Sequence, residues 1–593
     1  MTSHAPSPAA AAAAAASPTG VPVGFGERRL ILCCFTLYET RTKFYIVASD
    51  QCAINYRVLH ISRTVPLPAL SVTDDKVVYT KSEVAELLAM VEDGNRNVGG
   101  LKKVMGFHGL FGFVRFLEGW YMILITKRSP VALLGGHAVY HVDDTLILPI
   151  VASVPKADRR IEEQRYFQIF CQIDTSKNFY YSYSYELTQT LQNNILFATQ
   201  GPPPGITATG ATVFPCLQPN AMFMWNHHLI TPAFPNLASP WAIPVIHGFV
   251  DQCKISIYGH ILYITLIGRR SRFFAGARFL KRGLNDEGYV ANDVETEQIV
   301  ADATTSALFN PHHRECGRSP ATSFVQHRGS IPLYWSQENT NLAPKPPIQL
   351  DVVDPFCAAA ALHFDHLLHR YGGPIIILNL IKRKEKIKRE SLLMDEFAAT
   401  VSYLNQHLPP KNQMRYIAWD MARASKSPDQ DVIGVLEAIA EQVLRTTGFF
   451  HAGPEPYALA QRRGTPVNRV MERRQSGVAR TNCIDCLDRT NAAQFMLGKC
   501  ALGHQLCALG VLPNARIPFD CDIINMLNAM YHDHGDTIAL QYGGSHLVNT
   551  METYRKISLW TPHSRDMIES IRRYYSNSFT DAEKQDAINL FLG

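Results

Sequence analysis

Hydrophobic and polar residues alternate, or run apolar over strand length, through the first third of the chain. Short segments of this kind, separated by turn-forming residues, are typical of β-strands. They occupy 28–40, 43–50, 56–61 and 111–142. The last segment is expected to contain three strands, with turn signals at Glu118-Gly119, Ser129-Pro130 and Gly135-Gly136. Residues 81–95 carry apolar residues at helical spacing, so a helix is expected there. The pattern predicts a strand-rich α+β unit over residues 25–195.

Helical periodicity becomes common in the rest of the chain. Helices are expected over 185–192, 351–372, 391–408 and 431–448, and the apolar run PIIILNLI (374–381) has the length of a buried parallel strand. Strands alternating with helices indicate an α/β catalytic unit, which we expect over 196–550, followed by a helical extension over 551–593. Residues 1–24, rich in Ala, Pro and Ser, are expected to form a disordered tail.

Composition narrows the class of protein. A hydrophobic content of 46% over 593 residues allows large cores, and a net charge of +5 is too small for a general nucleic-acid binder. The thirteen cysteines, an odd number without repeating spacing, indicate free thiols in a reducing compartment. No run reaches the roughly 18 apolar residues of a membrane span, so a soluble or peripheral protein is expected.

Reactive side chains are dense in ARTNCIDCLDRTNAAQF (479–495). Three interpretations compete. A zinc site would need a second pair of ligands beside Cys483 and Cys486, and the sequence offers none at suitable spacing. A redox pair would not require the neighbouring aspartates and arginine. The third interpretation is a loop that wraps around a phosphate and leads into a helix.

The spacing C-x5-R, from Cys483 to Arg489, fits the phosphate loop. Backbone N–H groups and the N-terminus of the following helix would point at the anion and stabilise a Cys483 thiolate. Arg489 could hold two phosphate oxygens at once, and attack by the thiolate would give a phosphocysteine that water hydrolyses. Asp485 and Asp488 are both candidates for the general acid, and the sequence does not rank them. The scheme needs neither a metal nor a cofactor.

The string RTNCIDCLDRTN (480–491) resembles the signature of Sac-domain phosphoinositide phosphatases. Further similar blocks follow the family order at 179–192, 276–300, 325–337 and 532–545, so that the resemblance covers about 28–593. It implies an α+β N-terminal Sac subdomain followed by an α/β catalytic subdomain with a CX5R phosphate-binding loop. Residues of these blocks expected to bind substrate are Arg480, Asn482, Thr490, Asn491, Asp533, Asp536, Arg278, Lys281 and Arg282. Asp533 and Asp536 could instead supply the acid or orient water, and the three basic residues of 278–282 could instead form structural ion pairs.

Details such as LYETRTKFYIV and LVNTMETYRKISLW are similar to the branch that removes the 5-phosphate of phosphatidylinositol 3,5-bisphosphate. For that branch the resemblance implies a complex with a PIKfyve-type lipid kinase and a HEAT-repeat scaffold. It also implies a cytosolic protein that binds peripherally to late endosomal, vacuolar or lysosomal membranes. Branch members usually continue for a few hundred residues beyond the catalytic domain, whereas this sequence stops at Gly593; it could be a truncated chain, an incomplete gene model or a shorter form, which leaves open the partner contacts of the missing part.

Three alternatives remain open at this point. The chain could be a broader Sac phosphatase acting on monophosphates, a mainly structural subunit of the kinase–scaffold complex, or a protein tyrosine phosphatase. Two basic runs, seven arginines between Arg462 and Arg489 and KRKEKIKRE (382–390), could bind an anionic lipid surface or simply be solvated.

Overall fold

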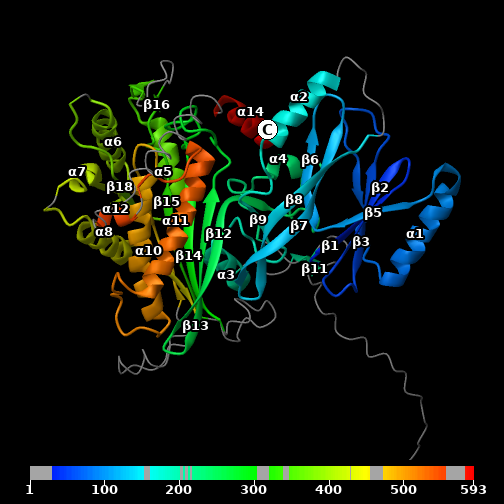
Figure 1. Cartoon of the computed structure of the whole chain (residues 1–593), viewed down its shortest axis with the longest axis horizontal. Helices are drawn as coiled ribbons and strands as arrows, with labels where there is room; N and C mark the ends of the chain where they lie inside the picture. The colour runs from blue at the N-terminus through cyan, green and yellow to red at the C-terminus, as the bar shows by residue number, and fades with distance from the viewer. Residues whose placement is uncertain are drawn as a thin grey trace, which may run out of the picture.

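The structure is a computed structural model (Figure 1). It describes residues 30–151, 160–200, 205–206, 212–213, 217–303, 320–337, 346–386, 388–427, 429–453, 472–549, 551–555 and 581–593. The expected tail over 1–24 and most of the stretch 551–580 therefore lie outside the described residues.

The N-terminal part is built on a five-stranded sheet in the order β4-β3-β2-β1-β5. Its elements are β1 (Cys34–Glu39), β2 (Lys43–Ser49), β3 (Tyr56–Ser62), β4 (Val72–Asp74), α1 (Lys81–Asn95), the 3₁₀ turn η1 (Arg96–Val98) and β5 (Lys102–Phe107). The helix expected over 81–95 is confirmed. It begins at a capping box, in which Thr80 and Glu83 each accept a hydrogen bond from the other's backbone N–H.

A second sheet of 13 strands runs through both expected subdomains. Its main path is β19-β18-β22-β15-β14-β13-β12-β9-β8-β7-β6, with β20 and β21 attached at β15. The strands from the first part are β6 (Gly109–Arg115), β7 (Trp120–Leu134), β8 (His137–Pro149) and β9 (Phe179–Tyr181). Those from the second part are β12 (Val245–Ile257), β13 (His260–Arg270), β14 (Val294–Asp302), β15 (Ala321–Arg328), β18 (Ile375–Asn379), β19 (Arg415–Ala418), β20 (Phe450–Ala452), β21 (Glu472–Arg473) and β22 (Val478–Asn482). Since β9 pairs with β12, the boundary expected near residue 195 does not separate two sheets.

Two local expectations are wrong. Ser129-Pro130 is not a turn, because both residues lie inside β7, whose register with β8 is irregular around them. Residues 185–190 are not helical, and α3 (Leu191–Gln200) begins only after them. Buried Arg269 donates hydrogen bonds to the carbonyl oxygens of Leu187 and Gln189, which in a helix would accept from backbone N–H groups of the same helix.

The remaining helices cover the second part of the large sheet. They include α5 (Ala358–Tyr371), α6 (Glu390–Asn405), α7 (Met421–Ala424), α8 (Val432–Thr447), α10 (Asp488–Ala508) and α11 (Asp522–Gly543). The helices expected over 391–408 and 431–448 and the strand over 374–381 are confirmed within a few residues. The helix expected over 351–372 is confirmed only from Ala358 onward, because residues 351–357 are not helical. Shorter elements are α4 (His227–Ile230), η3 (Pro410–Asn412), α12 (Met551–Arg555) and the two-stranded sheets of β10 (Gly205–Ile206) with β11 (Thr212–Val213) and β16 (Trp335–Ser336) with β17 (Gln349–Leu350).

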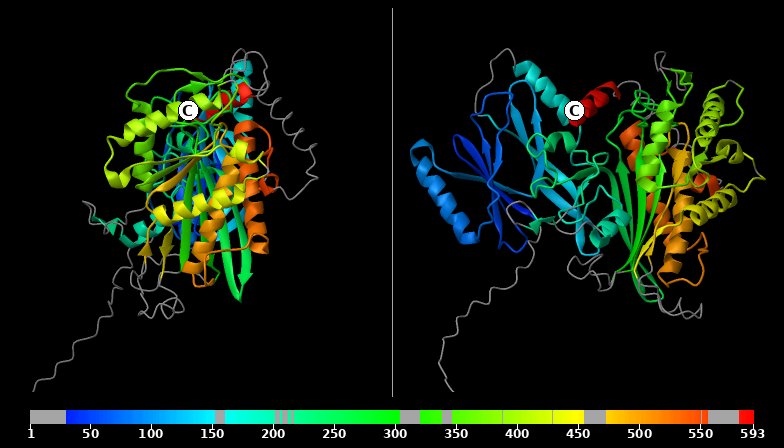
Figure 2. Two further views of the ribbon diagram at one scale, coloured as in Figure 1. Left: turned by 90° about the vertical axis from the view of Figure 1, so that its left-hand side faces the viewer. Right: turned by 180° about the vertical axis from the view of Figure 1, so that it is seen from behind.

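The C-terminal helix α14 (Asp581–Leu592) returns to the N-terminal part, where it lies beside α2 (Arg160–Cys171), as Figures 1 and 2 show. Phe591 is fully buried, and its ring lies 5.6 Å from that of Phe170 and 5.8 Å from that of Phe179. The two ends of the chain therefore share one hydrophobic core. Within the described residues, no helix is long and apolar enough to cross a bilayer.

Candidate active site

Four parallel strands end at one edge of the large sheet. β22 lies between β15 and β18 and is parallel to both, and β19 continues the parallel set beyond β18. In sheets of this kind, ligands bind in the crevice outside the carboxyl ends of the strands. Residues 483–487 leave β22 at this edge, and α10 begins at Asp488. The cysteine-rich loop therefore joins a buried strand to a helix N-terminus, as its spacing predicted.

The two cysteines of the loop have different surroundings. Cys483 is the first residue after β22 and is 3% exposed. The Sγ–H of Cys486 donates to the carbonyl oxygen of Gly329, at 3.0 Å, and burial raises the pKa of the Cys486 thiol to about 12. A thiol that stays protonated and hydrogen-bonded is a packing group. The geometry thus leaves Cys483 as the nucleophile candidate of the loop.

Asp485 is held by two arginines from the segment 276–282. Arg278 donates from Nε (2.9 Å) and Nη2 (2.7 Å) to the two carboxylate oxygens, and Arg282 donates from Nη2 at 2.7 Å. Burial alone would raise the pKa of Asp485, but the two guanidinium charges hold it well below its usual range. An aspartate that remains ionised has no proton to give, so Asp485 is the poorer of the two general-acid candidates.

This clamp also fixes the path of the loop. Arg282 Nη1 donates to the carbonyl oxygen of Ile484 (3.0 Å), and Asn292 Nδ2 donates to that of Asp485 (3.2 Å). Arg278 and Arg282, expected to bind substrate, are therefore engaged in the structural ion pairs that the sequence left open as the alternative. Lys281, from the same segment, instead places its ammonium 4.6 Å from the ring centroid of Phe274.

Asp488 occupies the first turn of α10. Its Oδ1 accepts hydrogen bonds from the backbone N–H groups of Val548 (2.6 Å) and Asn549 (2.9 Å). These contacts bring the segment after α11 against the loop. Asp488 is partly exposed and is the remaining local candidate for the general acid.

Arg489 forms a buried ion pair with Glu390, a residue that sequence reasoning missed. Its Nη1 donates to Glu390 Oε2 at 2.9 Å and to the carbonyl oxygen of Leu380 at 2.8 Å. Although burial opposes the charged forms of both, the ion pair leaves the pKa of Arg489 above and that of Glu390 below its ordinary value. Both bonds use Nη1, so the Nε and Nη2 edge of the guanidinium remains for two phosphate oxygens.

A sequence signal for Glu390 did exist. It is the last residue of the basic run KRKEKIKRE and the first residue of α6, so it starts a helix after the carboxyl end of a parallel strand. Its carboxylate also accepts from the backbone N–H of Lys382 (3.0 Å) and lies 3.2 Å from the Lys382 ammonium.

Several expected substrate contacts lie beneath the loop instead of facing outward. Arg480 is fully buried and donates to Asn482 Oδ1 (2.9 Å), to His363 Nε2 (3.2 Å) and to the carbonyl oxygen of Ser330. Asn482 in turn donates to Asn379 Oδ1 at 2.7 Å, which joins β22 to β18. In this structure these buried side chains support the loop from beneath, and direct contact with substrate stays a prediction.

The residues on α10 and α11 are placed similarly. Thr490 is fully buried, and Asn491 bridges Arg328 Nη2 (3.1 Å) and the carbonyl oxygen of Tyr531 (2.9 Å). Asp536 accepts from the backbone N–H of Leu547 (2.8 Å), whereas Asp533 is exposed. Asp536 therefore organises the segment that reaches Asp488.

Comparison with known proteins gives consistent matches. The SacI homology domain family model matches residues 108–426. A polyphosphoinositide phosphatase of Schizosaccharomyces pombe is 46% identical and covers 94% of this chain and 64% of its own length. A phosphatidylinositol-3-phosphatase SAC1 of Arabidopsis thaliana (39% identical; 94% and 65%) and the SAC1-B enzyme of Danio rerio (31%; 94% and 84%) also match. The chain thus spans slightly less than two thirds of the first two relatives. A Legionella phosphoinositide phosphatase structure, at 12% identity and a TM-score of 0.24, is too distant to support an argument.

Proposed function

The chain belongs to the SacI homology domain family, and from this premise we propose that it is a phosphoinositide phosphatase that works through a phosphocysteine. The observation that carries the proposal is the placement of Cys483 between the end of a parallel strand and the N-terminus of α10. Arg489 lies in the first turn of that helix. Relatives that match nearly the whole chain are named phosphoinositide phosphatases.

The proposed reaction uses the residues as follows. The Cys483 thiolate attacks phosphorus, an S–P bond forms and the ester O–P bond breaks. Arg489 and the backbone N–H groups of the loop hold the transferring phosphoryl oxygens, while Asp488 protonates the leaving inositol oxygen. Water then hydrolyses the S–P bond, which releases phosphate and restores the thiol. Asp485, locked between two arginines, keeps the loop in shape throughout.

We propose phosphoinositide monophosphates as the main substrates, because two of the matching relatives are named phosphatidylinositol-3-phosphatases. The second candidate is 5-phosphate removal from phosphatidylinositol 3,5-bisphosphate, which the similar blocks at 37–47 and 547–560 favour. If the second candidate is correct, we propose that the protein forms a complex with a lipid kinase of the PIKfyve type and a HEAT-repeat scaffold, on late endosomal, vacuolar or lysosomal membranes.

A panel of phosphoinositides tests both levels of the proposal. Wild type and Cys483→Ser are compared for phosphate release from each monophosphate and from the 3,5-bisphosphate. We expect release by wild type alone, with the monophosphates turned over fastest. Equal release by the two proteins would contradict the catalytic proposal, and release from the 3,5-bisphosphate alone would replace the first substrate by the second. A Cys483→Ser variant that preserves cellular lipid levels, where deletion of the whole protein does not, would favour the structural-subunit alternative.

A further inference from the structure

Large apolar side chains are exposed just before α5. Val352 is 56%, Val353 89% and Phe356 72% exposed, and they follow one another in a short segment between β17 and α5. Beside them lies a groove of about 180 Å³, lined mainly by apolar residues that include Leu333 and Leu350. Clustered exposed apolar residues of this kind usually mark a surface that binds something.

Chain topology places this segment at the catalytic edge of the sheet. α5 ends three residues before β18 begins and packs along it, so its first residues lie near the carboxyl end of β18. α6 also starts at that end, where Glu390 reaches Arg489. The rings of Phe364 and Phe397, each about two turns into its helix, stack at 6.4 Å, which shows that α5 and α6 run side by side. The exposed segment and the cysteine loop therefore face the same side of the molecule.

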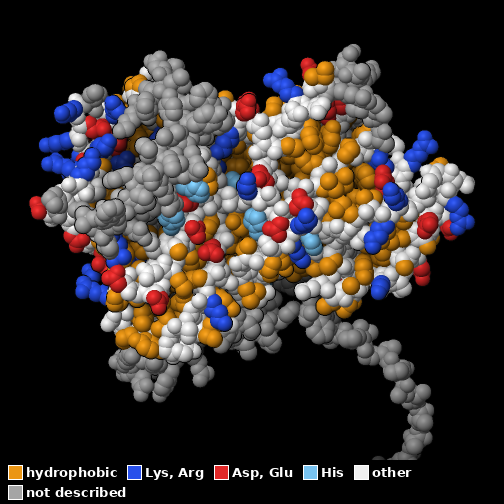
Figure 3. All heavy atoms as spheres, in the orientation of Figure 1, with side chains coloured by type: hydrophobic (Ala, Val, Ile, Leu, Met, Phe, Trp, Pro, Cys, Tyr) orange, Lys and Arg blue, Asp and Glu red, His pale blue; other side chains and the backbone are white. Residues whose placement is uncertain are grey.

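Basic side chains occupy the same edge. Residues 382–386 and 388–389, between β18 and α6, are not helical, and Arg383, Lys384, Lys386 and Lys388 are exposed. The acidic members of the run are engaged, because Glu390 pairs with Arg489 and Glu385 with Lys382. Figure 3 shows Lys and Arg side chains gathered at the upper left, over the region of α6 and α7.

Two acidic residues flank the apolar segment and keep their charge. Asp351 accepts a hydrogen bond from Ser336 Oγ at 2.6 Å, and Asp354 accepts from the backbone N–H of Ala359 at 3.2 Å. The start of α5 nevertheless exposes three large apolar side chains, and the loop before α6 exposes four cations, so the edge combines an apolar and a basic surface. An anionic lipid bilayer offers the matching pair, acyl chains for the first and head-group charge for the second.

We propose that this edge is a bilayer-docking surface, in which Val353 and Phe356 enter the lipid while Lys384, Lys386 and Lys388 bind anionic head groups. The inference rests on the proposed function in one respect, since a phosphatase for membrane lipids must present its active-site edge to the membrane. Docking through this edge would bring the loop of Cys483 to the head groups without a membrane-spanning segment.

Vesicle binding tests the proposal without requiring catalysis. The full-length Cys483→Ser protein is sedimented with phosphatidylcholine vesicles that contain or lack phosphatidylserine, at low and high salt. We expect the double variant Val353→Asp/Phe356→Asp to weaken binding at least about tenfold. Reversal of Lys384, Lys386 and Lys388 to Glu should remove most of the salt-dependent binding, at about fivefold per charge.

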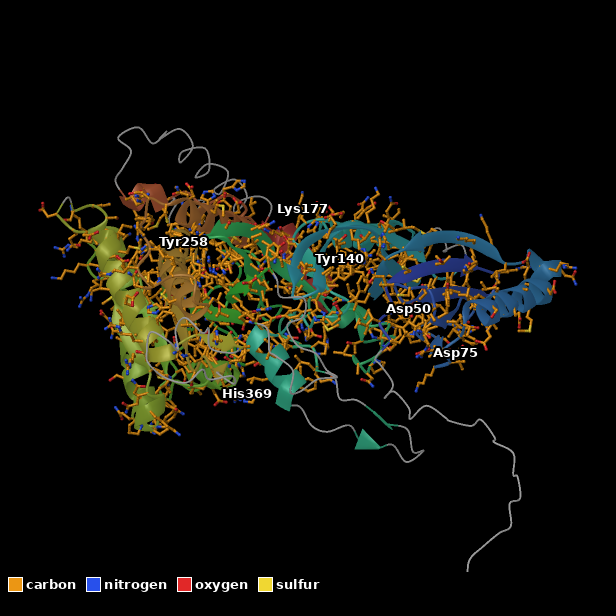
Figure 4. The ribbon with its side chains drawn as sticks, turned by 90° about the horizontal axis from the view of Figure 1, so that it is seen from below. Asp50, Asp75, Tyr140, Lys177, Tyr258 and His369 are labelled. Atoms are coloured by element: carbon orange, nitrogen blue, oxygen red, sulfur yellow. The ribbon has the colours of Figure 1, made fainter. Side chains whose placement is uncertain are left out.

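Tyr258 provides a matched control. It is 84% exposed in the β12–β13 turn, which lies at the amino end of the parallel strand direction and so at the opposite edge of the sheet (Figures 1 and 4). Tyr258→Asp should leave vesicle binding unchanged, and thermal unfolding of every variant should match the parent because the altered side chains are exposed.

Each outcome decides the question. Unchanged vesicle binding by the Val353/Phe356 variant would overturn the proposed insertion of apolar side chains. Unchanged binding by the lysine variant would overturn the proposed contact with anionic head groups. Absence of vesicle binding by the parent protein would exclude a bilayer as the occupant and favour a protein partner. With Cys483 intact, the surface variants should still hydrolyse a water-soluble short-chain phosphoinositide. If the Cys483→Ser parent binds vesicles but the protein with Cys483 intact hydrolyses none of these lipids, the proposed function fails and the docking surface stands.

Discussion

Glu390 offers the sharpest test of how the loop works, because it touches Arg489 and no other expected catalytic residue. The pair is nearly buried, with side-chain exposures of 14% for Arg489 and 9% for Glu390, and the two groups lie 2.9 Å apart. The changes to make are Glu390→Gln, which keeps the shape and an acceptor oxygen, and Glu390→Ala, which leaves Arg489 without its counter-charge.

The structure sets the expected magnitudes. Removing one partner of a buried ion pair costs about 3–5 kcal/mol, and we expect Glu390→Ala to lower the free energy of unfolding by the lower part of that range, since Arg489 keeps its bond to Leu380. Glu390→Gln should cost about 1–2 kcal/mol, because the ion pair becomes a hydrogen bond from the charged guanidinium to a neutral amide oxygen. A guanidinium displaced by about 1 Å lowers the rate about 10²-fold, so kcat should fall that far in Glu390→Ala and about tenfold in Glu390→Gln.

Urea unfolding gives the stability change, and phosphate release at several substrate concentrations separates kcat from KM. We expect kcat to fall while KM rises little, since Arg489 keeps its charge and loses only its alignment. A purely structural role for Glu390 would destabilise the protein without changing kcat in the folded fraction. A Glu390→Gln variant with wild-type kcat would refute the reasoning.

Three further predictions follow from the same loop. Arg278→Gln should remove two of the three hydrogen bonds that Asp485 accepts from arginine side chains and lower kcat/KM by at least about tenfold. Lys281→Gln, in the same segment but outside the clamp, should leave kcat/KM within about twofold. Equal effects of the two variants would contradict a clamp on Asp485. Cys486→Ala should cost about 1 kcal/mol of stability and retain activity, and loss of activity equal to that of Cys483→Ser would contradict its assignment as a packing residue. Because the folded-state pKa values of Asp485 and Glu390 are depressed, their stabilising contribution is complete above the unfolded value near pH 4 and is lost as the pH falls below it; acid unfolding curves of wild type and Glu390→Gln should therefore converge at low pH, and parallel curves would refute this linkage.

Local periodicity predicted much of the fold. The helix at 81–95 and the strand–loop–helix around Cys483 depend on patterns within a few residues, such as the capping box at Thr80, and these patterns are visible in the sequence. The turn expected at Ser129-Pro130 failed because β7 continues through irregular pairing with β8. Pairing with a distant strand is invisible to a local pattern.

The candidate site was predicted in its centre and not in its surroundings. Cys483 and Arg489 are separated by only five residues, across the loop and the start of α10, so their spacing carried the information. The partners of that loop come from elsewhere in the chain, Glu390 from 99 residues away and Arg278 from 207. Whether Arg278 faces substrate or pairs with Asp485 depends on tertiary contacts that sequence spacing does not contain.

The shared core of the two chain ends bears on how the protein folds as it is synthesised. Phe591 fills a space among Phe111, Phe170 and Trp225, residues translated more than 350 positions earlier. Until α14 leaves the ribosome, the N-terminal core has an open apolar face, and β9 has β8 as a partner but lacks its second partner until β12 has been made. The N-terminal core therefore cannot be completed as it is translated, and its last apolar surface is covered only once α14 has been made.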